Sequence, residues 1–160
     1  MQRRKFIVTL IVAIALAALT GCASLPSPDV MKAEVASYQL PMLPEPGKAI
    51  CYMVRPAELG WLTRFNVFVD NRKDSSEMGY TRSSQYIYFN LLPGNHTIYS
   101  KAENWAVIEI YAKTGDIIFI EQESEMGAFM PRNNLTRLKD YEGKYHVKNL
   151  TVGTILKTDK

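Results

Sequence analysis

Cysteine and histidine are scarce in this chain of 160 residues, which contains two of each. Two cysteines are too few for a disulfide-rich miniature domain, which depends on several cystines. The HExxH, GxSxG, P-loop and CxxC motifs are all missing, so the common hydrolase, nucleotide and redox signatures are not found. We therefore predict a protein that is not an enzyme and has no catalytic residue, metal or cofactor.

Long apolar runs are missing except at the beginning of the chain. Residues 6–19 are apolar with one exception, and they follow a basic block of Arg3, Arg4 and Lys5. As a helix the run would span about 21 Å, which is shorter than the ~30 Å hydrocarbon core of a bilayer. A basic block before a short apolar run is typical of an export signal peptide.

The run ends in Leu19-Thr20-Gly21-Cys22, which resembles the lipobox of bacterial lipoprotein precursors. The resemblance implies that residues 1–21 are a signal peptide, cut off between Gly21 and Cys22. It also implies that the Cys22 sulfur receives a diacylglyceryl group. Each buried CH₂ contributes about 0.8 kcal/mol, so two or three acyl chains on one cysteine anchor a protein firmly.

The residues after Cys22 bear on localisation. Ala23 and Ser24 follow the cysteine, and the aspartate that retains lipoproteins in the inner membrane is missing. The resemblance therefore implies a lipid anchor in the outer membrane, with the domain facing the periplasm. Arg3 and Arg4 also resemble a twin-arginine motif, but the short basic region and the strongly apolar run favour the general secretory route.

The net charge of +3 comes entirely from the signal segment. This segment contains three of the 19 basic residues and no acidic residue. The remaining chain therefore has 16 basic and 16 acidic residues. A neutral mature protein has no overall charge to attract nucleic acid, so we predict no nucleic-acid partner. We predict that the protein attaches to the membrane through the lipid on Cys22 and not through charge.

Proline is sparse after residue 47, because five of the eight prolines come before it. Proline lacks the backbone donor that helix interiors and central strands need. Residues 22–47 are therefore predicted to be the lipidated cysteine and a proline-rich tether. A flexible tether of this length would span about 28 Å. Residues 30–40 could hold a short helix.

The remainder alternates apolar and polar residues in short segments separated by turn residues, which predicts β-strands. We expect an all-β fold, a single antiparallel β-sandwich of about seven strands over residues 48–156, with a tail at 157–160. Pro93 and Gly94 suit a type II turn within a hairpin. The end of the domain is open between a short C-terminal helix from Asp140 and a last strand over 145–156. The expected strands are 50–55, 65–69, 86–91, 96–101, 105–112 and 117–123.

Four segments, residues 67–71, 78–80, 86–92 and 93–98, together resemble a family of bacterial lipoprotein domains of unknown function. They are also similar to the small PEGA-type sandwiches, which are named for a Pro-Glu-Gly-Ala motif. The resemblance covers roughly residues 48–125, although Asn71 stands where glycine is commoner and the tetrad itself is missing. It implies a β-sandwich and no established activity.

Aromatic residues supply the candidate site. Strand alternation places Tyr86, Tyr88, Trp105 and Tyr111 on the outward side of their strands, opposite the core-facing isoleucines. Aromatic rings gathered on one sheet face could stack on sugar rings or bind a protein. Alternatively, the tether, the C-terminal element or cross-strand pairing covers them.

The other chemistry-bearing residues have simpler interpretations. His96 begins a strand and should bond local carbonyls, whereas His146 lies among lysines and should be on the surface. Cys51, without a partner once Cys22 is lipidated, should be a buried small apolar residue. Glutamates 121, 123 and 125 alternate along about 13 Å of strand, which is too spread for converging metal ligands.

We therefore predict an outer-membrane-anchored periplasmic lipoprotein that acts as a non-enzymatic interaction module for an envelope protein or peptidoglycan. One alternative is an enzyme or inhibitor in envelope polysaccharide metabolism. Another is an assembly factor that binds a secreted subunit by edge-strand pairing. Converging carboxylates in a cleft would favour the enzyme, and an uncovered aromatic sheet face would favour the binding module.

Overall fold

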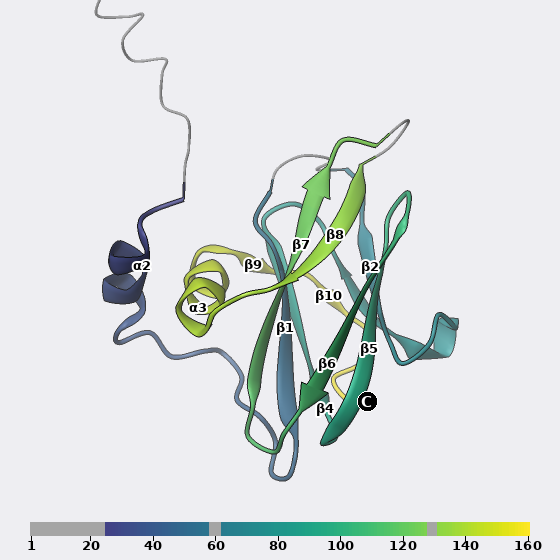
Figure 1. Ribbon diagram of the computed structural model, residues 1–160, viewed down its shortest axis with the longest axis horizontal. Helices are drawn as coiled ribbons and strands as arrows, with labels where there is room; N and C mark the ends of the chain where they lie inside the picture. The colour runs from purple at the N-terminus through teal and green to yellow at the C-terminus, as the bar shows by residue number, and fades with distance from the viewer. Residues whose placement is uncertain (1–24, 58–61, 128–130) are drawn as a thin grey trace, which may run out of the picture.

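The fold is described from a computed structural model, which describes residues 25–57, 62–127 and 131–160 (Figure 1). These residues form two five-stranded sheets, two α-helices and a short 3-10 turn, η1 (Asp74–Ser76). Sheet A has the order β8 (Arg132–Arg137), β7 (Ile117–Glu125), β1 (Ala49–Arg55), β4 (Gln85–Leu91) and β9 (Thr151–Val152). Sheet B has the order β10 (Thr154–Ile155), β3 (Glu77–Thr81), β2 (Phe65–Val69), β5 (Gly94–Lys101) and β6 (Trp105–Ala112).

The predicted all-β class is confirmed in its coarse form, because most of the regular structure is strand in two facing sheets. The prediction of about seven antiparallel strands is wrong in detail. Ten strands are found in the described residues, and β1 pairs in parallel with β7, as β4 does with β9. Alternation reveals that a segment is a strand but does not identify its partner.

The main core lies between the two sheets. Strand β1 sends Ala49, Cys51 and Met53 into it, and they meet residues of sheet B such as Val67 and Ile98. The same strand sends its even-numbered residues into a second apolar cluster on the other side of sheet A. Every residue of β1 is therefore buried, so sheet A is an inner layer with packing on both faces.

A polar link crosses the core near one end of the sheets. Gln122 of β7 accepts a hydrogen bond from Thr81 Oγ1 at 2.6 Å and donates one to Ser100 Oγ at 2.8 Å. Arg55, at the end of β1, is fully buried with its guanidinium 3.6 Å from the Phe65 ring centroid. Burial lowers the Arg55 pKa to about 10. These contacts connect the two sheets where the apolar core ends.

The predicted hairpin at Pro93-Gly94 is wrong. Strand β4 belongs to sheet A and β5 to sheet B, so this connection carries the chain between the sheets. Gly94 does have a positive φ, of 142°, but it is already the first residue of β5. Turn residues mark where a strand ends, whereas the sheet that receives the next strand is set by packing.

Within the residues that the structure describes, most of the segment predicted to be a tether is packed against the domain. Residues 28–48, here called the strap, lie along the outer face of sheet A. They begin with helix α2 (Pro28–Val35), whose Met31 and Val35 are buried. The expected short helix is therefore present, but it begins two residues earlier and ends five residues earlier than the predicted range of 30–40. Lys148 of the second helix holds α2 by donating to the Glu34 carbonyl at 3.0 Å.

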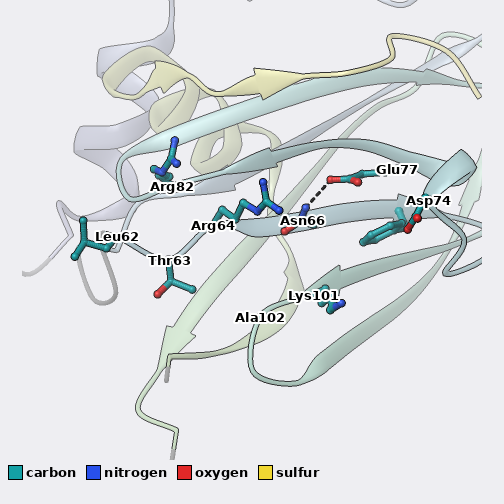
Figure 2. Close-up of a pocket in the computed structure, with 10 residues that line it drawn as sticks. Leu62, Thr63, Arg64, Asn66, Asp74, Glu77, Arg82, Lys101 and Ala102 are labelled. Carbon is teal, nitrogen blue, oxygen red and sulfur yellow. Dashed lines mark hydrogen bonds between the residues drawn. The ribbon is translucent and has the colours of Figure 1, made fainter. Parts of the chain in front are cut away.

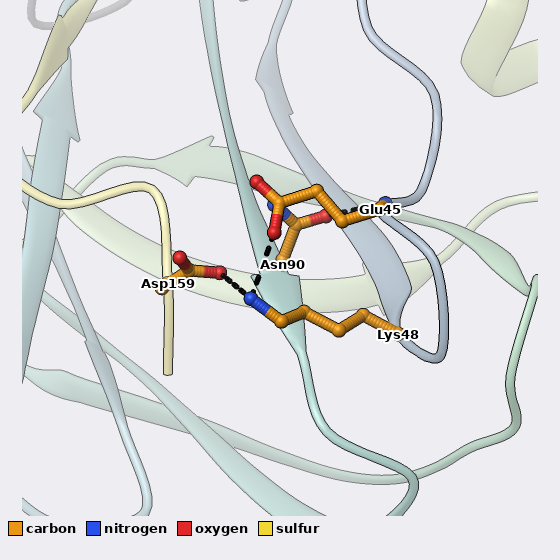
Figure 3. A network of polar contacts seen from close by, with 4 residues as sticks. All are labelled: Glu45, Lys48, Asn90 and Asp159. Carbon is orange, nitrogen blue, oxygen red and sulfur yellow. Dashed lines mark hydrogen bonds and ion pairs between the residues drawn. The ribbon is translucent and has the colours of Figure 1, made fainter.

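The rest of the strap is held by polar contacts. Tyr52 Oη donates to the Met42 carbonyl at 2.6 Å and accepts from the Met42 amide at 3.0 Å. Lys48 Nζ contacts Glu45 at 2.8 Å and Asp159 at 2.6 Å, next to Asn90 (Figure 3). The Asn90 side chain accepts from the Glu45 amide at 3.3 Å. Through Asp159 the predicted C-terminal tail is therefore fastened to the strap.

The second helix, α3 (Asp140–Asn149), confirms the C-terminal helix expected from Asp140. The alternative strand survives only as the short β9 and β10 that follow the helix. The Lys139 amide donates to Glu142 Oε2 at 3.0 Å, which satisfies one free donor at the helix start. Figure 1 shows α2 and α3 together on one side of the molecule, with β2, β5 and β6 on the other.

Gly143 brings α3 close to sheet A. A Cβ atom at this position would lie 2.0 Å from Cγ of Phe119 and 2.4 Å from its Cβ. These atoms are at the base of the Phe119 side chain, so a small rotation of the ring could not move them away from the added Cβ atom. The phenylalanine comes from β7 and also stacks on Tyr52, with ring centroids 5.5 Å apart. Helix α3 can therefore approach sheet A this closely only with glycine at position 143.

We predict that Gly143→Ala destabilises the protein. Alanine improves helix propensity by up to about 1 kcal/mol, but overpacking a full core costs about 1–3 kcal/mol. With contacts this short we expect the overpacking to win, for a net loss of about 1–2 kcal/mol in urea unfolding. Lys144→Ala, one residue along the helix, is the control and should stay within about 0.5 kcal/mol. A Gly143→Ala protein as stable as wild type would contradict this packing.

The expectation that His146 lies on the surface is wrong. His146 is only 4% exposed, because α3 turns its side chain inward beside Val147. Burial lowers its pKa, and the nearby Glu142 offsets part of that effect. The surrounding lysines in the sequence point elsewhere on the helix and gave a misleading impression of exposure.

We predict that stability falls as the pH drops below about 6.5, the His146 value in an unfolded chain. The unfolded state then binds a proton that the folded state resists, so the free energy of unfolding decreases. The slope from this one group cannot exceed about 1.4 kcal/mol per pH unit. Urea unfolding between pH 7 and 5 should show a shallower slope for His146→Gln than for wild type. Parallel slopes would contradict the assignment.

Candidate functional site

Two of the four predicted surface aromatics lie under the second helix and the strap. Tyr86 is 8% exposed and Tyr88 is partly buried on the outer face of sheet A. Both rings lie beside Tyr52, with centroid distances of 6.1 and 5.7 Å. Tyr38 of the strap and Val147 of α3 belong to the same cluster. The alternative that the tether and the C-terminal element cover these tyrosines is therefore the observed one.

The other two predicted aromatics lie on the outer face of sheet B. Trp105 is partly exposed there, and Tyr111 is 56% exposed on the same strand, β6. Because β4 and β6 belong to different sheets, the four residues do not form one surface. The prediction of a single aromatic face is corrected to a covered group on sheet A and an open group on sheet B.

The open group is larger than the sequence indicated. Phe68 of β2, which is itself buried, lies 5.3 Å from Trp105 between ring centroids, and Tyr99 of β5 meets the same indole edge-on at 6.4 Å. Tyr80 of β3 extends the row beyond β2, where it is paired with Asn66. The aromatic residues therefore run across four adjacent strands of sheet B.

Positively charged side chains lie over these rings. Arg64 and Arg82 flank Tyr80, with guanidinium carbons 5.2 and 5.5 Å from its centroid. Arg72 lies 4.9 Å from the Tyr99 centroid and 5.0 Å from that of Trp105. Lys101 Nζ lies 5.5 Å from Trp105. We call this surface the aromatic–cation face; its members are Arg64, Phe68, Arg72, Tyr80, Arg82, Tyr99, Lys101 and Trp105.

A hollow of about 750 Å³ opens on the aromatic–cation face (Figure 2). Its floor is polar, because Asn66 donates from its side-chain amide to Glu77 at 2.5 Å. The pKa of Tyr80 is lowered by a hydrogen bond with Thr154 and then by the charges of Arg82 and Arg64. The hollow is lined by Leu62, Thr63, Arg64, Asn66, Phe68, Asp74, Glu77, Arg82, Lys101 and Ala102.

Sequence reasoning missed Tyr80, Tyr99 and the cations around them. Alternation could have placed Tyr99 and Lys101 on one side of their strand. It could not have shown that they lie opposite Phe68 and Asn66, a register set by the β2–β5 pairing. The arginines lie on or beside loops, where no periodic pattern fixes their direction.

His96 has the local role expected from its position at the start of a strand. Its Nε2 lies 2.8 Å from the Leu92 carbonyl, and its Nδ1 lies 3.0 Å from Asp70 Oδ1. Asp70 itself has a φ of 66°, which confirms it as a turn residue. Both ring nitrogens are therefore engaged in holding the connection between sheets.

Cys51 is fully buried, as predicted, and burial raises its thiol pKa further from the range of a reactive thiolate. Glu121 is partly buried, which raises its pKa, and Glu123 and Glu142 add smaller effects of the same sign. Among the described residues no group of His, Cys, Asp or Glu side chains could hold a metal ion.

The predicted cleavage and lipidation residues, Gly21 and Cys22, lie outside the described residues. Within residues 25–57, 62–127 and 131–160, no helix has the length and apolar character needed to cross a membrane.

Comparison with known proteins adds one relative. No protein-family model matches the chain. It is 24% identical to an uncharacterised protein of Haemophilus influenzae over 135 residues, which cover 84% of this chain and 77% of that protein. That relative is itself uncharacterised, so the similarity brings no activity, ligand or partner with it.

Proposed function

We propose that the chain is an outer-membrane lipoprotein whose domain is a non-enzymatic binding module of the periplasm, for an envelope protein or peptidoglycan. Cleavage after Gly21 would free Cys22 for lipidation. The order of basic block, apolar run and lipobox supports the anchor. The two-sheet architecture agrees with the β-sandwich implied by the resemblance to uncharacterised lipoprotein domains and PEGA-type sandwiches, which we retain as part of the proposal.

The observation that carries the binding role is the difference between the two outer sheet faces. The strap and α3 cover sheet A, and its aromatic residues are used in packing. In the described part of the chain neither α-helix lies on sheet B (Figure 1). The outer face of this sheet keeps Trp105, Tyr111 and Val107 partly or largely exposed. An open aromatic face rimmed by charge is typical of a surface that meets a partner.

The short distance between Cys22 and the strap supports the same orientation. The strap begins at Pro28, six residues after Cys22, and a fully extended chain of that length spans at most about 22 Å. Lipid on Cys22 would therefore hold the α2 side of the molecule close to the membrane. The aromatic–cation face lies on the opposite side (Figure 1), where it would be turned towards the periplasm.

The alternative functions make different demands on the molecule. An enzyme or inhibitor of polysaccharide metabolism would engage its target through carboxylates in a cleft, such as Asp74 and Glu77 of the hollow, instead of through the rings. An assembly factor would offer a strand edge, such as β6 at the end of sheet B, instead of a sheet face. The site of contact on the domain therefore separates these functions.

We predict that Cys22→Ala accumulates as an uncleaved precursor without lipid and leaves the outer-membrane fraction. The measurement is incorporation of labelled palmitate, with gel mobility and membrane fractionation. Ser24→Ala keeps the lipobox and should be processed like wild type. Normal size, labelling and fractionation of Cys22→Ala would overturn the anchor.

The binding role is tested in the same cells with a photoreactive amino acid at Val107 of β6. Val30 of α2 is a matched control, because the two residues are 46% and 47% exposed. A discrete adduct with protein or glycan is expected from Val107 and none from Val30. Adducts only from Val30, or equal ones from both positions, would contradict a role for the open face.

A further inference from the structure

We infer that the hollow on the aromatic–cation face binds an acidic polysaccharide, whose carboxylates pair with the arginines around it. This inference rests on the proposed function, because it names the partner class of the same face. It depends on the charges of the hollow, the support of its arginines, and the side of the sheet on which it lies.

The cations of this face are available to a ligand. Arg64, Arg72, Arg82 and Lys101 make no ion pair within 4.0 Å among the residues that the structure describes. On the opposite side of the molecule, by contrast, lysines of the strap and α3 pair with neighbouring carboxylates, as Lys48 does with Glu45 and Asp159. Positive charge is therefore neutralised near the strap and left open on sheet B.

The local charge is positive in a mature chain that is neutral overall. Asp74 and Glu77 are the acidic residues of the hollow, against the three cations that line it. Arg72 adds a fourth, because it shares the Trp105 ring with Lys101. An anionic ligand would be attracted to this side of the domain, and salt would weaken the attraction.

The arginines are held in place before any ligand arrives. Arg72 lies against two rings, Tyr99 and Trp105, and Arg64 shares Tyr80 with Arg82. Stacking restricts the long side chain while leaving the edge of the guanidinium, with its N–H donors, free. Such a planar fork suits the two oxygens of a carboxylate. Less conformational entropy is then lost on binding than for a freely moving lysine.

The position of the hollow favours a polysaccharide over an extended acidic peptide. Its floor is β2, an interior strand whose backbone already pairs with β3 and β5. A peptide therefore cannot add to the sheet here, which is the common way to bind one in extended form. Asn66, Thr63 and Glu77 offer polar groups of the kind that sugar hydroxyls need.

The orientation of the domain disfavours the headgroups of its own membrane as the ligand. The strap begins at Pro28, six residues after Cys22, on the side of sheet A. Strands β2 and β5, which carry part of the lining of the hollow, lie across the molecule from α2 (Figure 1), which would place the hollow away from the membrane surface.

The test is calorimetric titration of the purified full-length chain, in neutral detergent, with polygalacturonate as a carboxylated polysaccharide. Neutral dextran, poly-glutamate and vesicles of phosphatidylglycerol are titrated in parallel. We expect polygalacturonate to bind in a salt-sensitive manner, at least about tenfold more tightly than any of the other three.

The variant Arg64→Gln with Arg72→Gln should weaken this binding by about tenfold or more. Lys113→Gln with Arg137→Gln removes the same charge from exposed positions elsewhere and should change it by less than about twofold. Arg72→Lys keeps the charge but not the fork, so intermediate binding is expected. Thermal melting of each variant confirms that it is folded.

Binding of poly-glutamate as tight as that of polygalacturonate would overturn the inference in favour of an acidic peptide. Binding of vesicles alone would overturn it in favour of the membrane, and binding of none of the four would remove the site. An equal effect of the two double variants would overturn the role of the arginines. None of these results changes the processing of Cys22 or the crosslinking from Val107, so failure here is distinct from failure of the proposed function.

Discussion

The close contact between Gly143 and Phe119 determines how the outer layer of the protein is built. Without a side chain at position 143, α3 settles directly on the ring of a sheet A residue. The helix then supplies the surface against which α2 packs, with Met31 and Val35 turned inward. A larger residue would push α3 outward and remove the support for the strap. Helix propensity, which disfavours glycine here, is overruled by this packing.

The outer layer makes the two sheet faces unequal. Sheet A lies between sheet B and the helices, so β1 is buried on both sides and Tyr86 becomes a core residue. Sheet B has one buried face and one open face, and the open face gathers rings and unpaired cations. A lipid on Cys22 would make the two sides of the domain differ further, because the anchor would lie near the strap, on the side of sheet A. Anchor and open face would then point in opposite directions.

Much of the local structure could be predicted from the sequence, because strand alternation and turn residues are local signals. Strands β1, β2, β4, β5, β6 and β7, the buried Cys51, the carbonyl contact of His96 and the helix from Asp140 all follow from such signals. The parallel β1–β7 pair, the passage of the chain between sheets at Gly94, and the covering of Tyr86 are set by tertiary packing. A period of two shows that a strand has two faces but not what lies on each. Of the eight residues of the aromatic–cation face only Trp105 was predicted, with Tyr111 on the same strand, because the other members depend on the strand register and on loop positions.

The docking of the strap is the feature on which the other conclusions depend, because it covers the outer face of sheet A and leaves the outer face of sheet B open to partners. Amide hydrogen exchange of residues 28–48, followed by mass spectrometry of the full-length protein, tests it most directly. We predict protection for the strap, where the Tyr38 amide bonds to Val35 and the Met42 amide to Tyr52. Exchange at the rate of an unstructured peptide throughout these residues would contradict the account.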